Sequence, residues 1–161
     1  EKAVQARIDH LMGIKGKKSV DSIHKELGHI MWEYVGMGRT EEGLKTALKL
    51  LKDIRKEFET NLFIPGSTEG VNIELEKALR LNDFITMGEL IAYDALNRNE
   101  SCGGHFREEY QTEEGEAKRD DENYFYVSCW EYQGSDDVAP VLYKEPLVYE
   151  AIKVQTRNYK S

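Results

Sequence analysis

Cysteine, basic charge and long apolar runs are all scarce in this sequence of 161 residues, and each scarcity excludes a class of protein. The two cysteines, Cys102 and Cys129, are 27 positions apart and form no CxxC pair, which excludes a zinc ribbon and a redox dithiol. The formal net charge of −8 argues against a nucleic-acid partner, because binding phosphates requires a basic stripe. No apolar run approaches the roughly 18 residues of a membrane-spanning helix, and the N-terminus lacks the order of a signal peptide. We therefore expect a cytoplasmic protein with reduced thiols and no direct membrane insertion.

The acidic excess is concentrated in one stretch. Residues 108–123 contain eight acidic and two basic side chains, which accounts for most of the net charge of the chain. We interpret this stretch as a solvated linker. The remaining composition, 40% hydrophobic and 32% charged, is typical of a globular protein with one core.

Three segments carry apolar side chains at alternating steps of three and four residues, which places these side chains on one face of a helix. Ser19, Thr40 and Asn72 precede the three segments and are candidate N-caps. The first stripe consists of Val20, Ile23, Leu27, Ile30 and Tyr34, and the second of Leu44, Ala47, Leu48, Leu51, Ile54 and Phe58. The third segment, 72–98, carries a seam of mostly small residues, Leu81, Ile85, Gly88, Ala92 and Ala95, beside a bulkier row of Phe84, Met87 and Ile91. The glycine at position 88 indicates that a neighbouring helix packs closely there.

Three amphipathic helices with short connections predict an up-down-up, spectrin-repeat-like bundle over residues 1–98, with a shorter helical segment at 1–12. After Arg98 the pattern changes to a turn-rich loop, the acidic linker, two strand-like runs at 124–132 and 139–143, and a tail. The predicted fold is therefore mainly α, with a C-terminal β-hairpin and an irregular tail. We expect residues 99–161 to pack on the same domain, with Cys129 as a small buried side chain and the tryptophans in aromatic packing.

Three residue groups resemble chemical sites, and we interpret each of them as structural. Glu26 and His29 form one Glu-x-x-His pair, whereas a di-iron bundle needs two such pairs and two further glutamates. Cys102 and His105 lie close in sequence but lack a third, orienting group. The glycines at 36 and 38 follow no strand and lack the third glycine of a dinucleotide fingerprint. Residue by residue, the sequence shows no catalytic or metal site.

The segment 98–110, Arg-Asn-Glu-Ser-Cys-Gly-Gly-His-Phe-Arg-Glu-Glu-Tyr, resembles the Arg-x-Glu-Ser-Arg-Gly-x-His-x-Arg-x-Asp segment of succinate dehydrogenase, fumarate reductase and L-aspartate oxidase flavoproteins. Residues 119–124 are similar to the Arg-Asp-Asp-x-Asn-Trp that follows in the first two, and residues 157–159 to an Arg-x-Tyr near their C-termini. Residues 26–31, Gly36 and Arg39 resemble the helix that opens their C-terminal domain. Cys102, Glu109 and Gln111 depart from the family pattern, which suggests a divergent branch.

The resemblance implies that the chain is the C-terminal structural and interface domain of a flavoprotein subunit. The parent enzyme would interconvert succinate and fumarate by hydride transfer to a covalently bound FAD, as part of electron transport and the tricarboxylic acid cycle. Its implied partners are the flavin-binding domain of the same chain, an iron-sulfur subunit and a membrane anchor subunit, on the cytoplasmic face of the inner membrane. The chain itself would hold no flavin and no catalytic residue. The residues implied at the interface are Arg98, Glu100, Ser101, Cys102, Gly103, His105, Arg107, Arg119, Asp120, Asp121, Arg157 and Tyr159.

Three alternatives remain open at this point. The chain could be the corresponding domain of an L-aspartate oxidase, a stand-alone helical interaction module, or a metalloprotein built on Glu26 and His29. The similarity at residues 119–124 and the long tail favour the respiratory enzymes.

Overall fold

The structure, a computed structural model, describes residues 1–134 and 138–155. Internal contacts divide the chain into two compact units, Glu1–Asn97 and Arg98–Ser161. The first unit contains α1 (Lys2–Gly13), β1 (Lys18–Ser19), α2 (Val20–Val35), β2 (Gly38–Arg39), α3 (Glu41–Asn61), β3 (Leu62–Phe63) and α4 (Ile73–Asn97). The second unit contains β4 (Phe106–Arg107), α5 (Asp121–Tyr124), β5 (Tyr126–Glu131) and β6 (Val141–Pro146). We describe each unit by itself.

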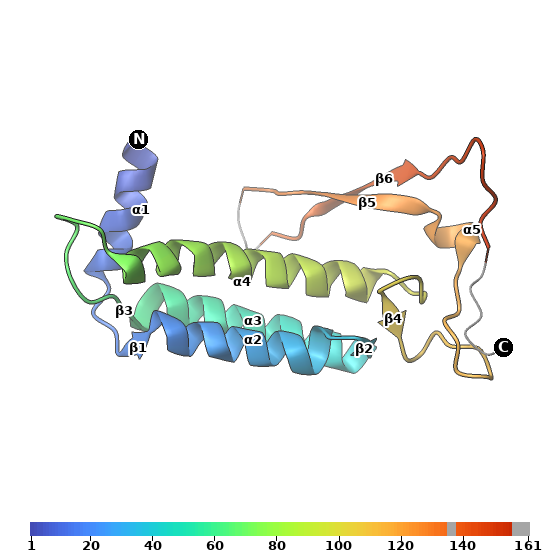
Figure 1. The fold of residues 1–161 in the computed structure, drawn as a ribbon, viewed down its shortest axis with the longest axis horizontal. Helices are drawn as coiled ribbons and strands as arrows, with labels where there is room; N and C mark the ends of the chain where they lie inside the picture. The colour runs from blue at the N-terminus through green and yellow to red at the C-terminus, as the bar shows by residue number, and fades with distance from the viewer. Residues whose placement is uncertain (135–137, 156–161) are drawn as a thin grey trace. The chain divides into compact units, whose positions relative to one another are not determined.

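The three long helices α2, α3 and α4 confirm the predicted bundle, and they run up, down and up (Figure 1). Each begins at the cap that the sequence indicates. The side-chain oxygens of Ser19, Thr40 and Asn72 accept the backbone N–H three residues later, at 3.2, 3.0 and 3.0 Å. Each cap therefore satisfies one of the backbone donors that the first turn of a helix leaves without a partner.

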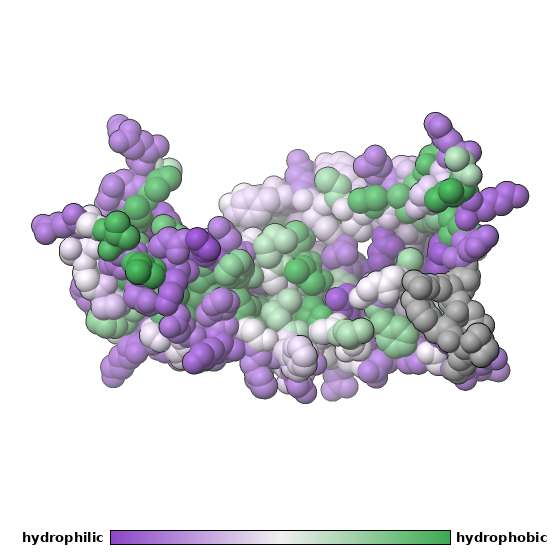
Figure 2. Space-filling view, in the orientation of Figure 1, coloured by the Kyte–Doolittle hydropathy of each residue, from purple (hydrophilic) through white to green (hydrophobic). Residues whose placement is uncertain are grey.

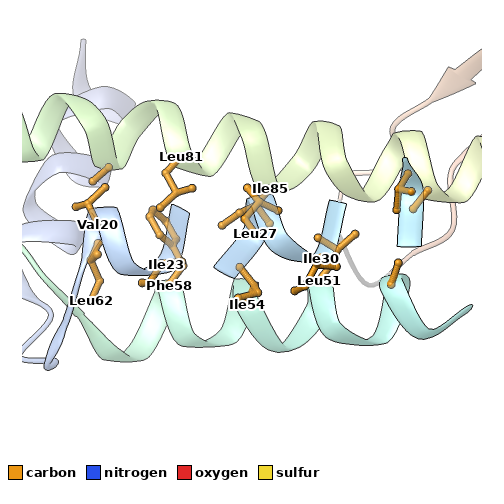
Figure 3. Close-up of a cluster of buried hydrophobic side chains, with 14 of the residues drawn as sticks. Val20, Ile23, Leu27, Ile30, Leu51, Ile54, Phe58, Leu62, Leu81 and Ile85 are labelled. Atoms are coloured by element: carbon orange, nitrogen blue, oxygen red, sulfur yellow. The ribbon is translucent and has the colours of Figure 1, made fainter. Parts of the chain in front are cut away.

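The core of the first unit fills the space between the three helices (Figure 3). The predicted stripes supply it: Val20, Ile23, Leu27 and Ile30 from α2, Leu51, Ile54 and Phe58 from α3, and Leu81 and Ile85 from α4. Gly88 lies where α4 packs closely against α2 and α3. A Cβ at this position would meet Met31 Sδ at 3.1 Å, with Leu27 and Leu51 at 3.6 and 3.7 Å. The expectation of close packing at this glycine is thus confirmed.

A short parallel pairing that the sequence did not predict joins β1 to β3, with Lys18 opposite Leu62 and Ser19 opposite Phe63. The neighbouring Gly16 makes this possible. Its backbone N–H donates to the Leu62 carbonyl at 3.1 Å, and a Cβ there would lie 1.9 Å from the Asn61 carbonyl carbon. Only glycine fits at position 16, so the segment that precedes α2 lies directly against the C-terminal end of α3.

The predicted hairpin is present in the second unit as β5 and β6, which pair antiparallel from Tyr126 opposite Pro146 to Glu131 opposite Val141. The second strand ends three residues later than predicted, at Pro146, and it begins at Val141. Of the turn predicted at 133–137, residues 135–137 lie outside the described residues. Between Leu147 and Gln155 the chain has no helix or strand, as expected for a tail.

Three details differ from the sequence-based expectations. Cys129 is exposed rather than buried, because it lies on the outward side of β5, which alternates with the side that carries Trp130. Trp32 is 82% exposed instead of packed. The acidic linker is partly ordered, since Gln111 and Ala117 form a bridge and α5 follows.

Candidate functional site

The loop that follows α4 is organised around the carboxylate of Glu100, which is only 2% exposed. Its Oε1 accepts from Arg98 Nη1 at 2.6 Å, and its Oε2 accepts from the backbone N–H of Asp120 at 2.9 Å. A buried carboxylate is tolerated only with such partners. Glu100 therefore connects the start of the loop to the start of α5.

Arg98 extends this connection to the hairpin. Its Nη1 donates to the Tyr124 carbonyl at 3.2 Å, and its Nη2 donates to the Tyr126 carbonyl at 2.9 Å. The guanidinium also lies over both tyrosine rings, 5.6 Å from the centroid of Tyr124 and 5.1 Å from that of Tyr126. The planar fork of arginine suits this arrangement, in which three oxygens and two ring faces surround one side chain.

Ser101 closes the loop on Arg107. The Ser101 hydroxyl accepts the Arg107 backbone N–H at 2.8 Å and donates to the Arg107 carbonyl at 3.1 Å. Both residues are fully buried. The Arg107 side chain donates through Nε to Glu109 at 3.0 Å and lies over the ring of Tyr110 at 5.4 Å. The hydroxyl therefore binds both backbone groups of Arg107, whose carbonyl also accepts the Tyr110 N–H at 2.8 Å.

Cys102 and His105 form the tip of the loop through their backbones. The N–H of each donates to the carbonyl of the other, at 2.8 and 3.0 Å, and Gly103 supplies the positive φ of 59° that the turn needs. The His105 ring donates from Nε2 to the Arg98 carbonyl at 2.9 Å, which fixes the proton on that nitrogen. The imidazole thus has a structural contact in this loop.

Arg119, Asp120 and Asp121 form the approach to α5. Asp120 caps this short helix by accepting the Asn123 N–H at 3.2 Å. Arg119 donates to Asp121 Oδ1 from Nε at 2.9 Å and from Nη2 at 2.5 Å. Burial opposes the charge of Arg119, but the hydrogen bonds and charge of Asp121 outweigh it and raise the pKa of the guanidinium.

The structure therefore gathers ten of the predicted interface residues in the second unit, from Arg98 to Asp121. The other two, Arg157 and Tyr159, lie outside the described residues. The sequence did not predict the two tyrosines whose backbone carbonyls accept hydrogen bonds from Arg98. The period-two aromatic pattern at 124–126 was visible, but nothing in the sequence pairs it with an arginine 26 to 28 positions away.

The Glu26 and His29 pair does not form part of a metal site in the described ranges 1–134 and 138–155, where no group of three metal-ligating side chains occurs. Glu26 instead accepts from Lys18 Nζ at 2.8 Å, and His29 is exposed. Among the helices of these ranges, none is long and apolar enough to cross a membrane.

Comparison with known proteins identifies the family of this chain. Residues 24–159 match the family described as fumarate reductase flavoprotein C-term. The chain is 29% identical over 146 residues to the fumarate reductase flavoprotein subunit of Helicobacter pylori, which covers 91% of this chain and 20% of that subunit. It is 37% identical over 88 residues to L-aspartate oxidase 2-b of Nicotiana tabacum, or 55% of this chain and 13% of that enzyme.

The fold has a solved counterpart in a quinol-fumarate reductase with menaquinol molecules, with a TM-score of 0.77 and 24% identity over 94% of this chain and 25% of that chain. The chain spans only 13 to 20% of the length of the curated relatives that it matches. The matched family covers most of the sequence, from the second turn of α2 to the tail. This chain therefore belongs to the family of C-terminal domains of fumarate reductase and succinate dehydrogenase flavoproteins.

Proposed function

We propose that this chain is the structural and interface domain of a flavoprotein subunit that interconverts succinate and fumarate by hydride transfer to FAD. The observation that carries the proposal is the family match over residues 24–159 in a chain that spans about a fifth of flavoprotein subunits such as that of Helicobacter pylori. In this proposal the chemistry belongs to the remaining four fifths of the polypeptide.

Gly36 and Gly38 do not fit a flavin cradle. A dinucleotide site needs a glycine turn between a strand and the N-terminus of a helix. Gly36 instead ends α2, and a Cβ there would lie 2.7 Å from the Trp32 carbonyl oxygen. Gly36 is therefore the C-cap of α2 and Gly38 the first residue of β2, and no catalytic step is assigned to this chain.

The loop anchors support a positioning role. Glu100, Ser101 and Arg107 were predicted at an interface, yet all three are buried. We infer that they hold the loop in one conformation, while direct contact falls to exposed positions such as Gly103 and Asp121. The proposed partners are the flavin-binding domain, in which FAD would be covalently attached, and the iron-sulfur and membrane anchor subunits of a complex on the cytoplasmic face of the inner membrane.

The test is the activity of the complete gene product, purified from membranes. We expect flavin that stays with the denatured polypeptide, together with succinate oxidation by an artificial electron acceptor and the reverse reduction of fumarate. The 161-residue chain alone is expected to be colourless and inactive. A complete gene product without flavin or without either activity would overturn the proposal.

L-Aspartate oxidase is the second candidate, because the identity to the tobacco enzyme is higher although it covers a shorter stretch. The same preparation distinguishes the two. Hydrogen peroxide release from L-aspartate, without succinate oxidation, would identify the oxidase.

A further inference from the structure

Helix α3 has a basic face, although the net charge of the chain is −8. Lys45, Lys49, Lys52 and Lys56 follow one another at steps of four, three and four residues, and all four side chains are exposed. These steps place them on one side of the helix, away from its buried stripe. We call these four residues the α3 lysine face. Figure 2 shows hydrophilic and hydrophobic residues interspersed over one side of the molecule, so hydropathy alone distinguishes no binding surface there.

Most of the α3 lysine face is not neutralised by the protein itself. Lys45 forms an ion pair with Glu41. The other three lysines form no ion pair with any residue in the ranges 1–134 and 138–155. Lysines three and four positions apart on a helix repel one another. The face therefore lowers the stability of α3 unless an acidic partner offsets the repulsion.

Other cations of the first unit have acidic partners. Arg55, on another side of α3, pairs with Glu89 at 2.6 Å. Lys77 on α4 pairs with Asp21 at 3.2 Å and with Glu74 at 2.9 Å. A row of lysines without such partners indicates a surface that binds negative charge.

The second unit presents carboxylates on an ordered turn within the acidic linker. The backbone N–H of Gly115 donates to the Thr112 carbonyl at 2.9 Å, and the Thr112 N–H donates to the Glu116 carbonyl at 2.8 Å. Gly115 supplies the positive φ of 80°. Glu113 and Glu114 lie at the tip of the turn and are exposed. We call these two glutamates the acidic turn.

The two surfaces are complementary in charge, and both are held by backbone hydrogen bonds, so their association costs little backbone entropy. A single exposed ion pair contributes little to binding. In a two-fold dimer, however, each copy uses both of its surfaces, so every pair forms twice. The net charges of two copies repel, but at about 0.1 M salt this repulsion is screened beyond about 10 Å, whereas groups in contact still attract. A second copy therefore supplies the complementary charge without any further component.

We propose that the α3 lysine face of one copy binds the acidic turn of a second copy, so that the complete gene product forms a two-fold dimer that salt dissociates. This inference concerns assembly and does not depend on the flavin chemistry proposed above. Electrostatic complementarity of this kind sets the orientation of the two copies and the salt dependence of their binding.

The test reverses the charge of each surface and then mixes the variants. In the complete gene product, Lys49→Glu with Lys52→Glu reverses the α3 lysine face, and Glu113→Lys with Glu114→Lys reverses the acidic turn. Within each variant the two surfaces then have the same sign and repel. In a mixed dimer of the two variants, both contacts again join opposite charges. Sedimentation equilibrium with one variant fluorescently labelled measures the dimer dissociation constant.

Lys2→Glu with Lys25→Glu is the matched control. It changes the net charge as much as the reversal on α3, but at exposed positions of α1 and α2. Thermal unfolding followed by circular dichroism verifies that every variant folds.

We expect the dissociation constant of the wild type to rise at least about tenfold between about 0.1 and about 0.5 M salt. Each reversed variant should weaken its own dimer at least about tenfold, and the equimolar mixture should return to within about threefold of the wild type. The control should equal the wild type.

A wild type that stays monomeric at both salt concentrations would overturn the inference, and so would reversed variants that do not associate when mixed. Hydrogen-exchange protection of the Glu113 and Glu114 amides that does not change with protein concentration, but is lost in Lys49→Glu with Lys52→Glu, would assign the acidic turn to its own chain. Binding of a monomeric wild type to phosphatidylserine vesicles would assign the lysines to a membrane surface. Both results would also overturn the inference, and neither involves flavin content, which tests the proposed function separately.

Discussion

The carboxylate of Glu100 accepts the backbone N–H of Asp120, twenty positions further along the chain, at 2.9 Å. The same carboxylate binds Arg98, which in turn reaches the carbonyls of Tyr124 and Tyr126. One buried side chain thus links three segments of the second unit: the loop, the start of α5 and the first strand of the hairpin. The first two predictions concern this link.

Replacing Glu100 by glutamine should destabilise the second unit by about 2 kcal/mol. The amide keeps the shape of the carboxylate, but it loses the charge that pairs with Arg98 and directs an NH2 group at one of the two donors. Hydrogen exchange of the Asp120 and Asn123 amides measures this change. Glu113→Gln, at an exposed position of the linker, should alter the same amides by less than about 0.5 kcal/mol. Equal exchange in both variants would contradict the assigned role of Glu100.

Arg98→Lys should destabilise the hairpin. A lysine ammonium can bind Glu100, but it cannot donate at the same time in a planar fork to the two tyrosine carbonyls. We expect faster exchange in β5 and a loss of about 1 to 3 kcal/mol from the unfolding free energy of the hairpin. Arg80→Lys provides the comparison, since Arg80 forms an exposed ion pair with Glu76 within one helix and should tolerate the change.

Gly16→Ala should destabilise the first unit by about 1 to 3 kcal/mol, the usual cost of overpacking. The added Cβ would lie 1.9 Å from the Asn61 carbonyl carbon, so the β1 and β3 pairing would have to separate. Thermal unfolding followed by circular dichroism measures the loss. Gly13→Ala is the control, because a Cβ at this helical position meets nothing within 4 Å and should be neutral or stabilising. A melting temperature unchanged by Gly16→Ala would show that the pairing does not form.

Helix α1 should loosen from the bundle in acid. Burial tends to raise the pKa of Glu59, but hydrogen bonds from Arg7 and His10 outweigh it, so that the folded-state pKa lies below the ordinary value of 4.5. A carboxyl with a lowered pKa contributes stability that is complete above its unfolded value and is lost as the pH falls through its folded value. Amide exchange in α1 should therefore increase below pH 4.5, relative to α3.

Glu59→Gln should remove this acid dependence and show fast α1 exchange already at neutral pH, because Arg7 loses its bidentate partner. Glu69→Gln, in the exposed loop before α4, should retain the wild-type profile. If α1 exchange in the wild type does not respond to acid, Glu59 is not what holds this helix.

The helices and their caps could be predicted because their signals are local. Ser19 and Thr40 each act on a backbone N–H three residues away, and the apolar spacing that follows identifies the buried face. Gly88 was also predictable, since a glycine costs helix stability unless a neighbour requires the space. The hairpin was predicted from its two strand-like runs and the turn between them, although one of its ends was misplaced by three residues.

The remaining features depend on partners far apart in the sequence. Nothing near Gly16 indicates that Asn61 lies against it, and nothing near Arg98 indicates two tyrosines 26 and 28 positions away. Cys129 was expected to be buried because it lies in an aromatic-rich strand, but the sequence does not show which side of β5 is covered, and the residue is exposed. Trp32 was expected to pack because it is aromatic. In the structure the hydrophobic core of the bundle does not include Trp32, whose side chain is exposed.

The pairing beside Gly16 also bears on the order in which the chain folds. The backbone N–H of Lys17 donates to the Asn61 carbonyl, 44 positions away, at 2.9 Å. This hydrogen bond closes a loop that contains all of α2 and α3. Because these two helices are successive and antiparallel, their docking brings the loop ends together at little added entropic cost. The helical hairpin can therefore close as soon as residue 63 has been synthesised, whereas the network of Glu100 must wait for Tyr126. On the ribosome, the bundle is expected to start packing while the hairpin residues have yet to be added to the chain.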